Sequence, residues 1–192
     1  MKNRKKRSHR NQKFPIWTMI AGAVFLIGAA LIMAFSANST EVQPSNPYLI
    51  PPAVLNLPAP DLALTNLEGK AVSLRDYRGQ IVLVNNWATW CPPCLAEIPE
   101  LQAYYNDHAE DGFVLIGIEA GEPVSEVSAF VKSHGLTYPI WPDTEMKAIT
   151  AFRNNNLPSS YLIDAEGTIR YAWSGQINRA TLDKYVTPLL AP

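Results

Sequence analysis

The sequence predicts an α/β fold built on a central mixed β-sheet, with helices on both faces. Two apolar runs, 81–87 and 113–118, have the continuous hydrophobicity that is typical of strands buried on both faces of a sheet. Each run is followed by a segment with helical character, at about 92–108 and 123–134. Two β-rich runs then flank the turn sequence Asp-Ala-Glu-Gly at 164–167, which predicts a hairpin. The order βαβα, followed by a hairpin and a helix, indicates a mixed sheet covered by helices.

The remaining elements of the predicted domain are shorter. Segments 61–64 and 71–74 flank a turn that contains glycine, so they predict a small N-terminal strand pair. An extended piece is expected at 138–141, and a helix is expected at about 145–152. Segment 179–190 is expected to close the domain as a helix.

The charge of the chain is distributed unevenly. The net charge of the 192 residues is −1, but residues 1–13 hold seven of the sixteen basic residues and no acidic one. The rest of the chain has nine basic and all seventeen acidic residues, a net charge of −8. A basic tail on an acidic body is compatible with nucleic-acid binding, but the segment that follows the tail indicates a membrane instead.

That segment, 16–35, contains twenty residues and no charge. As a helix it is about 30 Å long, which matches the hydrocarbon core of a bilayer. Because flanks rich in Lys and Arg stay inside the cell, we expect residues 1–15 to be a cytoplasmic tail and 16–35 a single transmembrane anchor. The rest of the chain is then extracytoplasmic. A cleaved signal peptide is the alternative, since 34–37 offers small residues to a peptidase.

A proline-rich segment follows the predicted anchor. Six prolines lie between residues 36 and 60, with Ser and Asn among them. Proline removes backbone donors and favours extended polyproline II. We therefore expect 36–60 to be a linker and 61–192 to be the folded domain.

The chain has only two cysteines, Cys91 and Cys94, three residues apart at the start of the helix predicted at 92–108. Disulfides persist outside the cytoplasm, and thiols at this spacing can close and reopen as a redox couple. The helix N-terminus favours the thiolate of Cys91, which we expect to be the exposed nucleophile. Cys94, one turn further in, is expected to be more buried and to resolve the mixed disulfide.

The residues around the two cysteines narrow the chemistry. Pro92 suits the first turn of a helix, and both Pro92 and Pro93 lack an N–H that could stabilise a thiolate. A zinc site is the alternative for two close cysteines, but it needs four ligands. The histidines are His9, His108 and His134, which we expect across the membrane or at solvated helix ends. We therefore expect neither a metal nor another cofactor.

Five motifs resemble those of one family. They are PAPD at 58–61, VSLRDYRG at 72–79, VLVN at 82–85, WATWCPPC at 87–94 and LPSSYLID at 157–164. Within roughly 58–190 the chain resembles the membrane-anchored, thioredoxin-like proteins of the TlpA/ResA family. The resemblance implies a thioredoxin-like fold of the AhpC/TSA (redoxin) type with an added N-terminal β-hairpin. It also implies extracytoplasmic thiol–disulfide exchange, often in cytochrome c maturation.

The resemblance also assigns roles to single residues. Pro158 matches the cis-proline that faces the two cysteines in thioredoxin-like folds, although cis bonds are about 5–6% of X–Pro bonds in general. A cis-proline there presents the backbone of Leu157 to a bound peptide. We expect Trp90, Pro92 and Pro93 to flank the same substrate-binding surface.

Glu97 is the third residue expected to act in catalysis. It lies three residues after Cys94, so both side chains share one helix face. It matches an acidic residue that some ResA-like proteins place near their cysteines, where a partly buried carboxylate raises thiol pKa values and relays a proton to Cys94. Asn85 cannot titrate, so it cannot replace Glu97 in this role. No partner is evident from the sequence for the polar side chain of Asn86.

These inferences predict an extracytoplasmic oxidoreductase that reduces the disulfides of client proteins through Cys91 and Cys94. Recycling would need a membrane electron donor. Three alternatives remain open at this stage: a disulfide oxidase or isomerase, a non-catalytic factor that holds a client thiol, and a copper-delivery factor. The direction of electron flow depends on the reduction potential of the couple, which the sequence does not contain.

Overall fold

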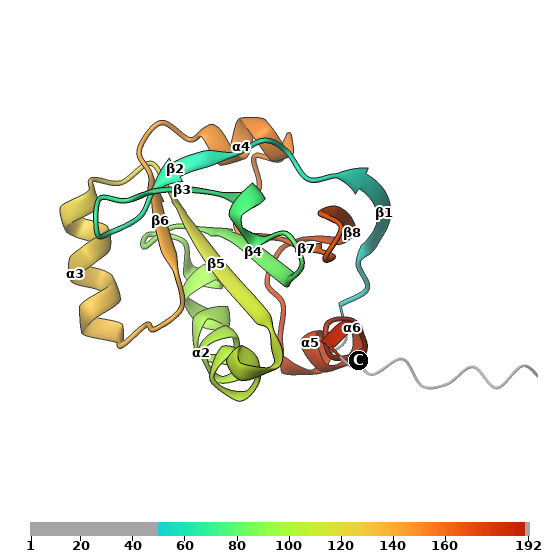
Figure 1. The fold of residues 1–192 in the computed structure, drawn as a ribbon. Helices are drawn as coiled ribbons and strands as arrows, with labels where there is room; N and C mark the ends of the chain where they lie inside the picture. The colour runs from blue at the N-terminus through green and yellow to red at the C-terminus, as the bar shows by residue number, and fades with distance from the viewer. Residues whose placement is uncertain (1–49, 191–192) are drawn as a thin grey trace, which may run out of the picture. The chain divides into compact units, whose positions relative to one another are not determined.

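The computed structural model describes residues 50–190, which form an α/β domain on a six-stranded mixed sheet (Figure 1). The strand order is β1-β8-β7-β4-β5-β6. Strands β4, β5 and β6 run parallel, and β7, β8 and β1 are added antiparallel. The bounds of the strands are β1 (Ala53–Pro58), β4 (Ile81–Trp87), β5 (Phe113–Ala120), β6 (Ile140–Asp143), β7 (Ser159–Ile163) and β8 (Thr168–Ser174). The predicted central mixed sheet is confirmed.

The helices cover both faces of this sheet. Their bounds are α2 (Pro92–His108), α3 (Val124–His134), α4 (Lys147–Phe152), α5 (Arg179–Tyr185) and α6 (Thr187–Leu190), with short 3₁₀ turns η1 (Leu74–Tyr77) and η2 (Ala109–Asp111). One hydrophobic cluster joins α2, α3 and α5 to one face, through residues such as Leu101, Val127 and Leu182. A second cluster joins α4 to the opposite face.

Strands β4 and β5 lie between the two clusters, which explains their continuous apolar sequences. Leu83 and Leu115 face the α2 side, whereas Val84 and Ile116 face the α4 side. All four side chains are fully buried. A strand that is covered on both faces has no position where a polar residue would meet water.

The predicted N-terminal hairpin is present as β2 (Ala63–Thr65) and β3 (Ala71–Ser73), which form a separate two-stranded sheet. Its turn contains Gly69, whose φ of 77° lies in the left-handed region that glycine adopts without strain. Leu64 and Val72 pack on the cluster that contains α4. The hairpin therefore helps to cover the face of the sheet opposite α2.

Two boundaries differ from the prediction. The helix expected over 179–190 is divided into α5 and α6, because Pro188 has no N–H to continue the helical ladder past Val186. The extended piece expected at 138–141 is a paired strand, since β6 adds to β5 in parallel.

The expected linker also ends earlier than residue 60. Strand β1 pairs antiparallel with β8, and the carbonyl of Ile50 accepts a hydrogen bond from Trp173 Nε1 at 3.0 Å. The folded domain therefore extends at least to residue 50 rather than beginning at 61. Prolines favour a linker in the sequence, but an edge strand also tolerates them because one of its sides has no neighbouring strand to hydrogen-bond.

The predicted tail (1–15), the predicted anchor (16–35) and residues 36–49 of the predicted linker lie outside the described residues. Within 50–190, no helix has the length and apolarity needed to cross a bilayer.

Candidate active site

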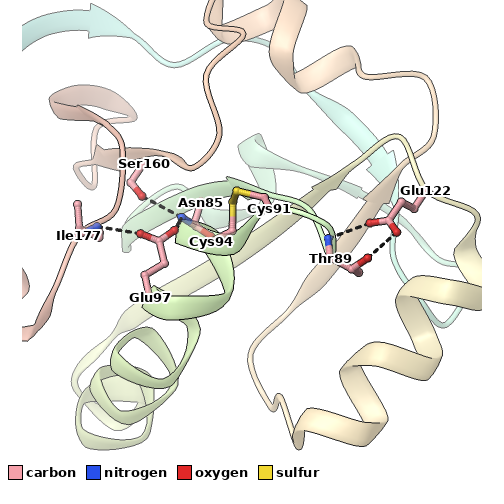
Figure 2. The surroundings of a disulfide bond; sticks show 8 residues. All are labelled: Asn85, Thr89, Cys91, Cys94, Glu97, Glu122, Ser160 and Ile177. Carbon is pink, nitrogen blue, oxygen red and sulfur yellow. Dashed lines mark hydrogen bonds between the residues drawn. A yellow bond between two sulfur atoms is a disulfide. The ribbon is translucent and has the colours of Figure 1, made fainter.

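Cys91 and Cys94 form a disulfide at the N-terminus of α2 (Figure 2). Cys91 is the N-cap residue in an extended conformation, and its carbonyl accepts the N–H of Leu95 at 3.1 Å. Pro92 and Pro93 occupy the first two helical positions. The first turn of α2 therefore presents fewer N–H donors to the Cys91 sulfur than an ordinary helix N-terminus does.

The two cysteines differ little in exposure. Cys94 is completely buried and Cys91 is 4% exposed. The expectation of an exposed Cys91 was therefore wrong for the disulfide form, although Cys91 remains the more accessible of the two. Its sulfur is bonded to a buried partner and lies within the hydrophobic cluster of the α2 face. The residues exposed around it are Pro92, Pro93 and Trp90, which is 65% exposed.

Glu97 is fully buried beneath the disulfide, one turn after Cys94 on α2 (Figure 2). Its Oε1 accepts a hydrogen bond from Asn85 Nδ2 at 2.7 Å, and its Oε2 accepts one from the N–H of Ile177 at 2.8 Å. Asn85 Nδ2 also donates to Ser160 Oγ at 3.0 Å. The carboxyl group thus connects α2 to β4 and to the segment that follows β8.

Burial raises the pKa of Glu97 to about 7, and the hydrogen bonds from Ile177 and Asn85 offset only part of that effect. A carboxyl group with a pKa near 7 is able to hold or release a proton at neutral pH. This property is the one required of a group that exchanges a proton with the Cys94 sulfur, which shares its helix face.

The structure provides a partner for Asn86. Its Nδ2 donates to Ser159 Oγ at 3.3 Å, just as Asn85 donates to Ser160 on the same strand β7. Ser159 and Ser160 were not identified from the sequence as part of the site. Their position directly after Pro158 was a usable signal, because that segment was already expected to face the cysteines.

The peptide bond between Leu157 and Pro158 is cis, as the resemblance implied. Pro158 is buried, and its carbonyl accepts the N–H of Gly175 at 2.8 Å. Leu157 lines a cavity of about 860 Å³ that opens beside the disulfide. The lining consists of Trp90 to Pro93, Ala120, Met146, Ile149, Asn155 to Leu157, Ser174 and Gly175. Four of the five predicted substrate-binding residues (Trp90, Pro92, Pro93 and Leu157) therefore meet at one cavity, whereas the fifth, Pro158, is buried and does not line it.

Two further acidic residues, Glu122 and Glu119, lie near the turn that leads into Cys91. Both carboxylate oxygens of Glu122 accept hydrogen bonds from Thr89, two residues before Cys91 (Figure 2). Glu119, at the end of β5, is fully buried nearby. The contact between Thr89 and Glu122 was not predicted from the sequence, because nothing in their spacing indicates that they meet.

No metal site accompanies these residues within the described chain. Among residues 50–190, no group of three or more His, Cys, Asp or Glu side chains is arranged to hold a metal ion. His108 and His134 lie at the C-terminal ends of α2 and α3. His108 Nδ1 lies 3.0 Å from Asp111 Oδ2, and His134 Nδ1 lies 3.0 Å from the carbonyl oxygen of Phe130.

Comparison with known proteins identifies the family of this chain. The AhpC/TSA family model matches residues 55–172. The thiol-disulfide oxidoreductase ResA of Geobacillus kaustophilus is 34% identical over 128 residues, which are 67% of this chain and 74% of that protein. ResA of Bacillus anthracis is 32% identical over 171 residues, which are 89% of this chain and 91% of that protein.

A solved structure agrees with these relatives. The thiol:disulfide interchange protein of the thioredoxin family from Chlorobium tepidum superposes with a TM-score of 0.64 at 31% identity. The match covers 72% of this chain and 99% of that one. The thioredoxin-like fold implied by the sequence motifs is thereby confirmed.

The raised pKa of Glu97 predicts how the stability of the oxidised protein depends on pH. The folded state binds the proton more tightly than the unfolded state, so the stabilisation is complete below the unfolded pKa of about 4.5 and is lost as the pH rises through about 7. Across this window, we expect the wild-type protein to lose about 3 kcal/mol relative to Glu97→Gln, which has no titrating group there.

Urea unfolding of the full-length disulfide form, followed at several pH values between 4 and 8.5, measures this difference. Glu119 titrates in both proteins, so its contribution cancels in the comparison. Glu126→Gln, on the exposed face of α3, is the matched control and should follow the wild-type curve. A constant difference between wild type and Glu97→Gln at all pH values would contradict the prediction.

Proposed function

The chain belongs to the AhpC/TSA family and is a protein thiol-disulfide oxidoreductase, and on that basis we propose that it reduces disulfides of client proteins outside the cell membrane. The observation that carries the proposal is the Cys91–Cys94 couple at the start of α2, with the buried carboxyl of Glu97 on the same face of that helix. The couple supplies two electrons, and the carboxyl group supplies or accepts a proton.

The proposed cycle begins with the dithiol form. The Cys91 thiolate attacks one sulfur of a client disulfide, which forms a mixed disulfide and releases the other client sulfur as a thiolate. Cys94 then loses its proton and attacks Cys91, which releases the second client thiol. The protein is left with its own disulfide, and the client has gained the two electrons and, with its thiols protonated, two protons.

Glu97 acts on Cys94 in this cycle. As a carboxylate it accepts the proton of the Cys94 thiol, which makes Cys94 a nucleophile for the second step. When a donor later attacks the disulfide at Cys91, the protonated carboxyl returns the proton to the departing Cys94 sulfur. In the disulfide form, hydrogen bonds from Asn85 and Ile177 orient the carboxyl group.

The environment of Cys91 supports a reducing couple. A couple becomes oxidising when its thiolate is strongly stabilised in the reduced protein. Here Pro92 and Pro93 remove two N–H groups from the start of α2, and the first charged side chain on the helix belongs to an acid, Glu97. Both features stabilise the Cys91 thiolate less than a donor-rich or basic site would.

The location and the clients are proposed from the sequence. The uncharged segment 16–35 behind the basic tail supports a membrane anchor with the redox domain outside. The resemblance to the TlpA/ResA family supports clients of the cytochrome c maturation type, in which cysteine pairs must be reduced. A membrane electron donor would then return the couple to the dithiol form.

Replacement of Cys94 should trap clients. Cys94→Ala removes the resolving thiol, so we expect covalent adducts through Cys91 that disappear on reduction. Non-reducing electrophoresis of the full-length protein measures the adducts. Cys91→Ala is the control and should give few or none. If Cys94→Ala instead kept full activity without adducts, the protein would hold its client rather than reduce it.

The reduction potential of the couple tests the direction of electron flow. We expect a value below about −250 mV, because the Cys91 thiolate has few stabilising neighbours. Equilibration of the full-length protein with glutathione or thioredoxin buffers measures it. A value near −120 mV would identify the protein as an oxidant and would contradict the proposal.

The accessibility of a single thiol to a membrane-impermeant reagent tests the proposed location. Because the chain has two cysteines, Cys94→Ala leaves Cys91 as its only thiol. In intact spheroplasts treated with a membrane-impermeant reductant, we expect a membrane-impermeant maleimide to label Cys91. The variant without either cysteine should remain unlabelled. Labelling that appears only after lysis would place the domain inside the cell.

A further inference from the structure

The loop that leads into Cys91 is fixed by an acidic side chain from a distant part of the chain. Glu122 lies between β5 and α3, and its two carboxylate oxygens accept the N–H of Thr89 at 2.9 Å and the Oγ1–H of Thr89 at 2.6 Å (Figure 2). Thr89 lies two residues before Cys91 in the same turn, where Cys91 N–H bonds to the carbonyl of Ala88. A bidentate contact of this kind to an ionised group is stronger than a neutral hydrogen bond.

A second carboxyl group, Glu119, lies behind Glu122. Glu119 is 0% exposed, and its Oε2 accepts the backbone N–H of Glu122 at 3.3 Å. Its Oε1 is buried and has no hydrogen-bond partner in the described part of the chain. In the sheet, its register partners are Trp87 on β4 and Pro142 on β6. Glu119 is thus a buried carboxyl group that the proposed redox cycle does not use.

The charged groups that shift the pKa of Glu119 are acidic. They are Glu122 in the loop and Asp143 on β6, and the raised pKa of Glu119, about 8, reflects burial first and these two neighbours next. The opposite holds for Glu122: burial alone raises its pKa, but its interaction with the Glu119 carboxyl group and the two hydrogen bonds from Thr89 lower it overall. One carboxyl group of the pair therefore carries the proton, and the other carries the charge.

Among residues 50–190, no cation is found to compensate a charge on Glu119. Strand β4 has no titratable residue, and α2 contributes the buried acid Glu97 to this side of the sheet. On α3, Glu126 and Lys132 are exposed to solvent. On α4, the Lys147 ammonium lies 3.3 Å from Glu145. Ionisation of Glu119 would therefore place a second negative charge against Glu122 without neutralisation.

We propose that neutral Glu119 is a positioning residue for Cys91, because it allows ionised Glu122 to hold Thr89, and that ionisation of Glu119 loosens this contact and exposes Cys91. The inference rests on the proposed function only in that Cys91 is the attacking thiol. It deepens that function by giving the site a pH-dependent control separate from Glu97, which acts on Cys94.

The oxidised full-length protein offers a direct test, because neither cysteine titrates in the disulfide form. The ¹H and ¹⁵N chemical shifts of the Thr89 amide report its hydrogen bond to Glu122. Between pH 6 and 9, we expect these shifts to move with a midpoint near pH 8 in the wild-type protein. Glu119→Gln, which stays neutral, should remove the transition, whereas Glu126→Gln on α3 should leave it in place.

Two results would overturn the inference in this arm. One is a Thr89 amide that does not respond to pH in the wild-type protein, which requires no variant to fold. The other is a transition that persists in Glu119→Gln but vanishes in Glu97→Gln, because the responsible carboxyl group would then be Glu97.

The reactive thiol gives a second readout. In the reduced Cys94→Ala protein, we expect the alkylation rate of Cys91, corrected for its thiolate fraction, to rise between pH 7 and 9 by up to about tenfold, the equivalent of one charge-assisted contact. Adding Glu119→Gln should abolish that rise. An equal rise with and without Glu119→Gln would contradict the proposal.

The outcomes separate this inference from the proposed function. If the Thr89 amide did not respond to pH in a protein that still traps clients, only the proposed role of Glu119 would be contradicted. If the Thr89 amide showed the expected transition in a protein that traps no clients, the proposed reduction of clients would be contradicted. The effect of Glu119 on the contact between Glu122 and Thr89 would still stand.

Discussion

The active site depends on the burial of one carboxyl group, that of Glu97. Burying a carboxyl group costs free energy, which hydrogen bonds to its oxygens offset, and here the two donors come from Asn85 on β4 and from the backbone of Ile177 after β8. The three residues are far apart in sequence, so the group joins the active-site helix to the centre of the sheet and to the C-terminal segment. The same burial that makes these bonds necessary also raises the pKa of the carboxyl group to about 7, and the two hydrogen bonds offset part of that effect.

Much of this arrangement was predictable from local patterns. The continuous apolar runs of β4 and β5 identified the centre of the sheet, because strands covered on both faces leave no room for alternation. The spacing of Cys94 and Glu97 placed both on one face of α2, since residues three apart on a helix are neighbours. The cis bond at Pro158 came from the resemblance alone, because nothing in the local sequence distinguishes a cis from a trans proline.

The features that escaped prediction depend on contacts between distant segments. Thr89 and Glu122 are 33 residues apart, and neither belongs to a regular element whose periodicity would relate them. The serines that bond Asn85 and Asn86 lie more than 70 residues away on β7, and the register that aligns them follows only from the finished sheet. Strand β1 lies in the segment predicted to be a linker, because its proline content is a local signal. Its pairing with β8 is a contact between distant segments, which local composition does not reveal. The low exposure of Cys91 likewise follows from its bond to Cys94 and from tertiary packing rather than from its place at a helix end.

The cavity beside Cys91 has walls without any formally charged side chain. Charged walls attract a partner over roughly a Debye length, about 8 Å at physiological ionic strength, and the attraction weakens as salt is added. The walls include Trp90, Met146, Leu157, Asn155 and Asn156. Such walls would discriminate between binding partners by shape and by apolar surface, at short range. We therefore expect binding at this surface to depend little on ionic strength.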